Sequence, residues 1–402
     1  MDSPPVEDAA ARGRADLLKA MAGADQRGWA AVRRQFPVLR EWVYLDTATF
    51  GPAPRRGLAA AERHARRRDQ RACQDFLSWF DDADRVRALA ARLLNGRPED
   101  ICFAPNTGTA LGWLVQGIRW RRGDQVVALQ NEFPNNIYLG HMLEKRGVEF
   151  VQAPLGGGGF SLEAFCDVLN RRTRLVVMST VNYATGFRPP VEEIGACLRK
   201  RGILYYVDAT QSLGALRLDA EAVGADMVAA HGYKWLLAPA GIGVAYVNRR
   251  VREWLPPAVI SWRSHRDWRQ VDSLHHGSPE LPAGALKYEG GLQNFPGIYA
   301  LGAILEMMLA LGLEPIERRV TALAAQGREV LRRAGGELLH DRLPHYDSPI
   351  LAARFPGGDV GAMAQRLRQA RVVVSARHGH LRVSPHFFNN EADLELLAEG
   401  LG

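Results

Sequence analysis

Short apolar runs, separated by stretches of helical character, recur from about residue 60 to residue 280. The clearest of these runs are 126–129, 175–178, 203–207, 227–229 and 243–247. Strands that are buried on both faces have such continuous runs, whereas strands with one wet face alternate apolar and polar residues. The pattern therefore predicts an α/β fold with a mostly parallel sheet between helices. Ligands of such sheets bind beyond the carboxyl ends of the strands.

The remainder of the chain is expected to form an N-terminal extension and a second, smaller domain. Residues 1–40 have the pattern of a charged helical extension, and residues 41–290 hold the large domain. Residues 291–402 are expected to form a small α+β domain with strands at 350–355 and 372–375. A chain of 402 residues is long enough for two such domains.

Composition argues against several classes of protein. No apolar run reaches the length of a membrane span, and the first residues show no secretory signal. The net charge is +7, but the basic residues occur in short runs between acids, and no nucleic-acid motif is present. The four cysteines, Cys73, Cys102, Cys166 and Cys197, lack metal-ligand spacing. We expect a cytoplasmic protein with reduced thiols and with no metal, membrane or nucleic-acid partner.

The most specific signal is a lysine that follows a strand-terminal aspartate. Asp208 ends the run 203–207, and Lys234 lies in the segment Ala-His-Gly-Tyr-Lys-Trp-Leu, before a glycine-rich stretch. A lysine can hold pyridoxal phosphate (PLP) as a Schiff base, and an acid at the pyridine nitrogen keeps the ring protonated. A surface lysine and an unrelated aspartate are the alternative, which the neighbouring segments disfavour.

A second segment has the features of a phosphate site. Asn106-Thr-Gly-Thr-Ala opens an amphipathic stretch, so backbone donors and the helix dipole at its start can bind an anion. A plain N-cap by Asn106 or Thr107 is the alternative. His231 and Tyr233, which flank the lysine, can also donate to a phosphate.

Further segments supply candidates for contacts with a ring and with a substrate. Phe133 follows a strand and can stack on a pyridine ring, although it is equally suited to a core. The amides of Asn182 and Gln211 can donate to a ring oxygen, or they simply form turns. Arg382 precedes a Ser-Pro turn, and its guanidinium can bind a substrate carboxylate bidentately. Arg377 is the second choice for that role.

In their order and spacing, the segments from Tyr44-Leu-Asp-Thr-Ala to Arg382-Val-Ser-Pro-His-Phe-Phe-Asn resemble the class V aminotransferase group of fold-type I PLP enzymes. That group includes cysteine desulfurases, kynureninases and isopenicillin N epimerases. The motifs Phe-Pro-Asn-Asn and Tyr-Lys-Trp are most similar to those of the epimerase-like and carbon–sulfur-lyase-like branches. The resemblance implies a seven-stranded large-domain sheet, a homodimer, and Lys234 and Asp208 as catalytic residues.

The resemblance also implies a set of cofactor contacts and one substrate contact. The implied cofactor-binding residues are Thr107, Gly108, Thr109, Phe133, Asn182, Asp208, Gln211, His231, Tyr233 and Lys234. Arg382 is implied for the substrate carboxylate.

Two departures from the group bear on the reaction. Leu292 stands where many relatives have a threonine that reaches the phosphate of the partner subunit, and no cysteine follows Cys197. Desulfurases need a mobile cysteine ahead of the carboxylate-binding arginine, so persulfide transfer by that route is not expected. We expect Lys234 to deprotonate Cα of an α-amino acid, followed by β-elimination of a thiol from a cysteine S-conjugate. The alternatives are an epimerase or aminotransferase, and, in a different class, a degenerate fold that only binds partners.

Overall fold

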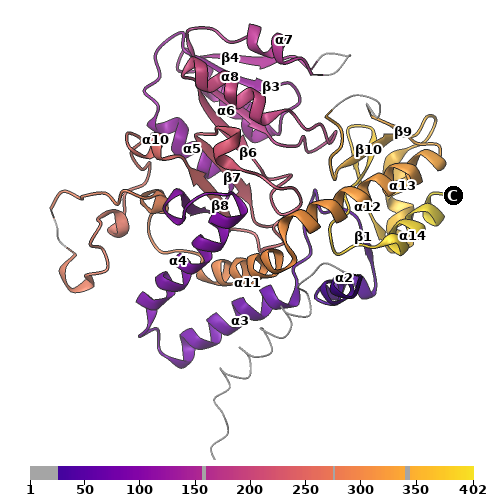
Figure 1. Ribbon diagram of the computed structural model, residues 1–402, viewed down its shortest axis with the longest axis horizontal. Coiled ribbons are helices and arrows are strands. Elements are labelled where there is room, and N and C mark those ends of the chain that lie inside the picture. Colours follow the sequence, from indigo (N-terminus) through magenta and orange to yellow (C-terminus); the bar gives the residue numbers. More distant parts are fainter. Residues whose placement is uncertain (1–25, 156–159, 275–276, 340–344) are drawn as a thin grey trace, which may run out of the picture.

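The computed structural model describes residues 26–155, 160–274, 277–339 and 345–402. These residues form a large α/β unit and a smaller unit, which contains the C-terminus and is mainly yellow in Figure 1. Of the predicted extension over 1–40, residues 1–25 lie outside the described part of the chain. The rest of it contains the helix α2 (Gln26–Arg33) and the 3-10 helix η1 (Pro37–Arg40).

The large unit is built on a seven-stranded sheet in the described part of the chain, with the strand order β2-β8-β7-β6-β5-β3-β4. Strand β8 is antiparallel to both neighbours, and the other neighbouring strands run parallel. The bounds are β2 (Ile101–Ala104), β3 (Gln125–Leu129), β4 (Glu149–Ala153), β5 (Thr173–Ser179), β6 (Leu204–Asp208), β7 (Met227–His231) and β8 (Gly243–Val247). The predicted α/β fold with a mostly parallel sheet is confirmed.

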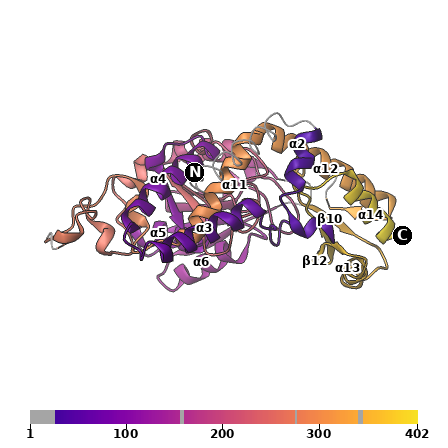
Figure 2. The same cartoon turned by 90° about the horizontal axis from the view of Figure 1, so that it is seen from below.

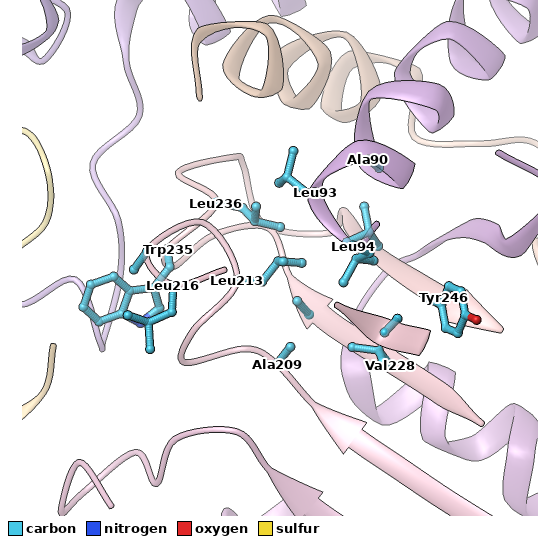
Figure 3. Packing of buried hydrophobic residues seen from close by; sticks show 14 of the residues in the cluster. Ala90, Leu93, Leu94, Ala209, Leu213, Leu216, Val228, Trp235, Leu236 and Tyr246 are labelled. Carbon is cyan, nitrogen blue, oxygen red and sulfur yellow. The ribbon is translucent and has the colours of Figure 1, made fainter. Parts of the chain in front are cut away.

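Successive residues of the central strands point into two different cores, one on each face of the sheet. Val127 and Val176 belong to one core, whereas Val126 and Val177 belong to the other. This two-sided burial explains why the strands read as continuous apolar runs. Figure 3 shows part of the first core, where Val228 of β7 packs with leucines of neighbouring segments.

Helices cover both faces of this sheet (Figure 1). The helices of the large unit are α3 (Arg55–Gln70), α4 (Phe76–Leu93), α5 (Thr107–Gly117), α6 (Pro134–Glu144), α7 (Leu162–Asp167), α8 (Val191–Arg201), α9 (Ala220–Val223) and α10 (Arg249–Arg252). Helix α11 (Phe295–Leu311) lies along α3 and α4, as Figures 1 and 2 both show, and most of its residues are buried.

Among the described helices, none alone is long and apolar enough to cross a membrane. Helices α11 and α12 (Leu313–Arg333) meet that criterion only when they are taken together, and they are bent by 84° at the break between them.

The small unit has an antiparallel sheet in the order β12-β13-β10-β9, and it has its own core. Its elements are β9 (Glu337–Leu338), β10 (Leu351–Arg354), α13 (Val360–Gln369), β11 (Val372–Val373), β12 (Ser375–Arg377), β13 (His380–Val383) and α14 (Glu391–Leu401). Strand β1 (Val43–Tyr44) comes from the other end of the chain and pairs in parallel with β11. This pairing brings the residues that follow β1 next to β12 and β13.

Candidate active site

A cavity lies at the carboxyl ends of strands β5, β6 and β7, where ligands of parallel sheets bind. Its lining residues are Phe133, Ser179, Tyr183, Asp208, Thr210, Gln211, His231 and Lys234. The sheet therefore brings five of the predicted site residues together, and it adds Ser179, Tyr183 and Thr210, which the sequence analysis did not select.

Lys234 is held in a tight turn after β7. Gly51 N donates to Tyr233 O at 2.8 Å, and a Cβ at Gly51 would lie 2.1 Å from Lys234 O, so the two segments can meet only through a glycine. Lys234 is 7% exposed, and no described residue accepts a hydrogen bond from its Nζ. Its Nζ lies 5.4 Å from the centre of the Phe133 ring. The amine is therefore enclosed but unengaged.

The charge state of this lysine differs from that of a surface lysine. Burial lowers the pKa of Lys234 to about 8, while the Asp208 carboxylate acts in the opposite direction and the Arg382 cation adds to the lowering. A buried ammonium loses its hydration, which favours the neutral amine. A neutral amine can act as a nucleophile or accept a proton.

Asp208 is the last residue of β6 and pairs with Ser179 and Ala229 on the adjacent strands. Its carboxylate is buried, and Oδ1 accepts a hydrogen bond from Thr210 N at 2.9 Å. This bond fixes the side chain at the wall of the cavity. A buried carboxylate in that position can pair with a cationic group of a ligand.

The start of helix α5 adjoins the cavity through His231. Thr107 Oγ1 lies 3.1 Å from His231 Nε2, and Asn106 caps the helix by accepting from Thr109 N at 2.8 Å. His231 Nδ1 is buried and has no hydrogen-bond partner among the described residues. A Cβ at Gly108 would lie 3.3 Å from Asn106 Oδ1, so a larger residue would crowd the first turn. An N-cap and a phosphate site are therefore compatible in this segment, because the cap uses only one backbone donor, Thr109 N.

Tyr233 is not among the residues that line the cavity, but its ring contacts that of His231, which is. Its ring centre is 4.9 Å from those of both His231 and Phe50. With Lys234, Asp208 and the unpartnered Nδ1 of His231, this arrangement fits PLP, which needs a lysine, an acid for its ring nitrogen and donors for its phosphate.

Phe133 lines the cavity and precedes helix α6, and its ring contacts that of Tyr183 edge to face at 5.2 Å. The neighbouring Glu132 fixes this position. It accepts hydrogen bonds from Ser179 N at 2.7 Å and from Asn136 Nδ2 at 2.9 Å. Burial raises the pKa of Glu132, while the hydrogen bonds oppose that change. Glu132 was not among the predicted site residues, although an acid next to Phe133 was a signal.

The two amides predicted to contact a ring oxygen are already engaged within the protein. Asn182 Nδ2 donates to Asn131 O at 2.7 Å, and Asn182 is not among the residues that line the cavity. Gln211 does line it, but its amide donates to Ala48 O at 3.1 Å and accepts from Trp235 Nε1 at 2.8 Å. Each of these amide nitrogens carries two hydrogens and donates only one of them here, so each keeps a second donor.

Arg382 lies on β13 and is 2% exposed. Its Nη1 donates to Tyr183 O at 2.7 Å, and Nη2 pairs with Asp46 Oδ1 at 3.1 Å and also donates to Thr49 Oγ1. Arg377 reaches the same Thr49 Oγ1 at 3.4 Å, and it makes no ion pair with any acid in the described part of the chain. Two guanidinium groups therefore meet beside the cavity, and only one of them has an acidic partner there.

His386 links the small unit to the lysine turn. Phe387 N donates to His386 Nδ1 at 2.7 Å, so the proton resides on Nε2, which donates to Trp235 O at 2.9 Å. Burial lowers the pKa of this histidine from 6.5 to about 3. The ring therefore stays neutral over the usual range of pH.

We expect His386 to make the protein less stable as the pH falls from about 6.5 to about 3. In that window the unfolded chain binds a proton that the folded chain excludes, so the free energy of unfolding decreases by up to about 1.4 kcal/mol per pH unit. Glutamine can keep the donor to Trp235 O but does not titrate. The free energy of unfolding of the wild type, measured with urea, exceeds that of His386→Gln by an amount that should be about 2 kcal/mol smaller at pH 5 than at pH 7. A gap that does not change would refute this assignment.

Leu292 follows a glycine pair that Arg263 holds in place by donating to Gly290 O at 3.2 Å and to Gly291 O at 3.0 Å. The Leu292 side chain is 68% exposed, and Val259 and Ile260 are also exposed. A Cβ at Gly290 would lie 3.5 Å from Val259, so the turn before Leu292 lies against Val259.

Comparison with known proteins identifies the family that this chain resembles. A model of the family described as aminotransferase class V matches residues 43–394. A probable cysteine desulfurase of Methanothermobacter thermautotrophicus is 29% identical over 393 residues, which are 92% of this chain and 96% of the relative. The isopenicillin N epimerase of Amycolatopsis lactamdurans is 28% identical over 397 residues, which are 93% of this chain and 98% of the relative.

A solved structure of a cystine C-S lyase in complex with cysteine persulfide has a TM-score of 0.83. The match covers 91% of this chain and 99% of that chain, at 22% identity, and so it shows the fold alone. Together these matches confirm the resemblance that the motifs indicated.

Proposed function

The chain belongs to the aminotransferase class V family and its cofactor is PLP, and we propose that it is a carbon–sulfur lyase that eliminates a thiol from a cysteine S-conjugate. One observation carries this proposal. Lys234, a buried lysine with a pKa lowered to about 8, shares a cavity with Asp208, in a chain that has no cysteine after Cys197.

Lys234 would bind the cofactor. Once the substrate has displaced Lys234 from the cofactor, Nζ of Lys234 would accept the proton from Cα of the substrate. When bound, PLP supplies an electron sink for that bond cleavage. A pKa near 8 leaves a sizeable neutral fraction of the amine at physiological pH, which suits a general base. Asp208 would stabilise a protonated ring nitrogen, because an opposite charge favours the charged form.

The phosphate would bind at the first turn of α5 and next to His231. Thr107 and Gly108 would supply backbone donors there, and the unpartnered His231 Nδ1 lies close by. Thr109 would join them by exchanging the bonds that its N and Oγ1 now donate to Asn106 Oδ1. Tyr233 adds a hydroxyl at the same end. Phe133, held by Glu132, would stack on the ring.

The absence of a cysteine over residues 198–402 separates this chain from relatives that pass sulfur to a protein thiol. Elimination needs no such acceptor. Lys234 Nζ takes the proton from Cα, the Cβ–S bond breaks, and the thiolate leaves with the bonding electrons. The three-carbon remainder then hydrolyses to pyruvate and ammonia. An epimerase or aminotransferase is the second candidate, and the epimerase relative, matched along 98% of its length, favours retaining it.

Incubation with a panel of cysteine S-conjugates should release one thiol, one pyruvate and one ammonia for each substrate consumed. Thiol is measured with a chromogenic disulfide, and pyruvate with a coupled dehydrogenase. Elimination needs no second substrate, so added 2-oxo acids should not change the rate. If no conjugate yields thiol while an amino acid exchanges its Cα hydrogen with solvent deuterium, the lyase proposal is wrong and the second candidate replaces it.

Arg382→Lys should weaken binding of the substrate carboxylate although it keeps the charge. A lysine cannot reproduce the guanidinium fork, and the loss of such hydrogen bonds costs about 1.5–3 kcal/mol, or roughly 10- to 150-fold in kcat/KM. Arg377→Lys is the matched comparison, because its side chain reaches the same Thr49. If Arg377→Lys shows the larger loss and Arg382→Lys behaves as the wild type, the carboxylate role belongs to Arg377.

We also propose that the protein is a homodimer with its sites at the interface. The exposed apolar surface of Leu292, Val259 and Ile260 supports this, because a monomer would leave these side chains in water. Leucine cannot donate to a phosphate, so Leu292 would contribute packing where relatives have a hydroxyl. Sedimentation of the holoenzyme as a monomer at micromolar concentration would contradict the proposal.

A further inference from the structure

Two cysteines distant from the cavity lie side by side. Cys166 is on α7 and Cys197 on α8, and their Sγ atoms are 2.7 Å apart, compared with about 2.05 Å for a covalent S–S bond. Both side chains are half-buried, and both are free thiols. The two helices are adjacent at the edge of the large unit, as Figure 1 shows.

Local structure fixes the position of this pair. Ser161 caps the start of α7 by accepting from Ala164 N at 3.2 Å, and Arg201 at the end of α8 donates to Cys166 O at 3.0 Å. Phe165 of α7 is buried in the core of the large unit, which anchors the helix. Little backbone movement is therefore needed to bring the sulfurs to bonding distance. The other two cysteines differ from this pair, because Cys73 is exposed and Cys102 is buried.

We propose that Cys166 and Cys197 are a redox-modification site that forms an intrachain disulfide by exchange with a small-molecule disulfide of the glutathione class. One thiolate attacks the small disulfide, forms a mixed disulfide and releases one small thiol. The second thiolate attacks the protein sulfur of that mixed disulfide and releases the other small thiol. Two protein thiols are oxidised to the disulfide, one small disulfide is reduced to two small thiols, and the two protons lost by the protein thiols end on those two small thiols.

The environment of the pair determines the kinetics of this exchange. Burial and the neighbouring Cys197 raise the pKa of the Cys166 thiol to about 11. Because only the thiolate reacts, the first step should be slow near neutral pH and faster at higher pH. The second step is intramolecular and should be fast, so the mixed disulfide should not accumulate. The disulfide would join α7 to α8. Helix α8 is followed along the chain by β6, which ends at Asp208.

The test treats the folded holoenzyme at pH 8.5 with oxidised glutathione, at a concentration that fully converts the exposed Cys73 to its mixed disulfide. Cys73 thus reports that the reagent is active. Peptide mapping after acid quench and alkylation should recover the peptides of Cys166 and Cys197 joined, 2 Da lighter than the two thiol peptides, and without glutathione. Dithiothreitol should restore both thiols.

Two results would overturn the proposal. One is that Cys166 and Cys197 remain alkylatable thiols while Cys73 is converted, and the other is that either of them keeps glutathione as a stable adduct. Cys166→Ser gives the matched control, because Cys197 then lacks a resolving thiol and should retain glutathione. The oxidised wild type should also melt at a higher temperature than its reduced form, whereas oxidation of Cys166→Ser should produce no such rise.

Discussion

Lys234→Ala should lose nearly all turnover while the protein remains folded. On the proposed role of Lys234, the variant would lack both the nucleophile that holds the cofactor and the amine that takes the Cα proton, and loss of a general base alone typically costs about 10²–10⁴-fold. Circular dichroism checks the fold, and turnover is followed as product release from the best S-conjugate. Lys200→Ala is the control, because Lys200 lies exposed at the end of α8 and should leave activity unchanged.

The same assignment can be tested on the wild type by borohydride reduction. Reduction should fix the cofactor irreversibly to one lysine, which peptide mapping should identify as Lys234. Recovery of the adduct on Lys145, Lys200 or Lys287 would contradict the assignment. So would a Lys234→Ala variant that turns over like the wild type. Methylamine should restore part of the lost activity, because a small amine can enter the space that the side chain leaves.

The architecture could be predicted because it depends on local pattern. Each central strand is buried on both faces, so its apolar run is visible in the sequence without knowledge of its partners. The strand ends then indicate the site, since Asp208 and His231 are the last residues of β6 and β7. Lys234 follows in a glycine-flanked turn. Each of these signals is local, because it lies at the end of a strand or within a few residues of one.

The residues that were missed depend on contacts between distant segments. Asp46 pairs with Arg382, which lies 336 residues away, because β1 joins the sheet region of the small unit. No local pattern records that pairing. Glu132 is 47 residues from Ser179, and its role in fixing Phe133 follows from the adjacency of β3 and β5. A sequence shows that such acids are present, but it does not show which donors they meet.

The amide of Asn182 shows how one side chain allows two interpretations from sequence. Its position after β5 suggested a ligand contact, yet its Oδ1 accepts from Ala184 N and Thr185 N, both at 3.0 Å. These are the bonds by which an asparagine shapes its own turn. The alternative interpretation of Asn182, as a residue that forms a turn, is therefore the one that these hydrogen bonds display.

Asp208→Asn should keep the fold and part of the cofactor but lose most of the turnover. An asparagine Oδ1 can still accept the bond from Thr210 N that now holds the aspartate in place, so the geometry of the cavity should persist. The charge is lost, and with it the stabilisation of a protonated ring nitrogen. An opposite charge at close range shifts a pKa by about 1–3 units. At saturating substrate, kcat should therefore fall by about 10- to 1,000-fold.

Bound cofactor, quantified by absorbance after alkaline release, separates this effect from simple loss of the cofactor. The rate is divided by that content, so only turnover of loaded sites is compared. Asp81→Asn on α4 is the control, since its carboxylate is exposed and makes only a surface ion pair with Arg269. The pairing role predicts a reduced kcat per loaded site with little change in KM, because Asp208 would act on the ring and not on the substrate carboxylate. A folded, loaded Asp208→Asn with near-normal kcat would mean that another group holds the ring nitrogen.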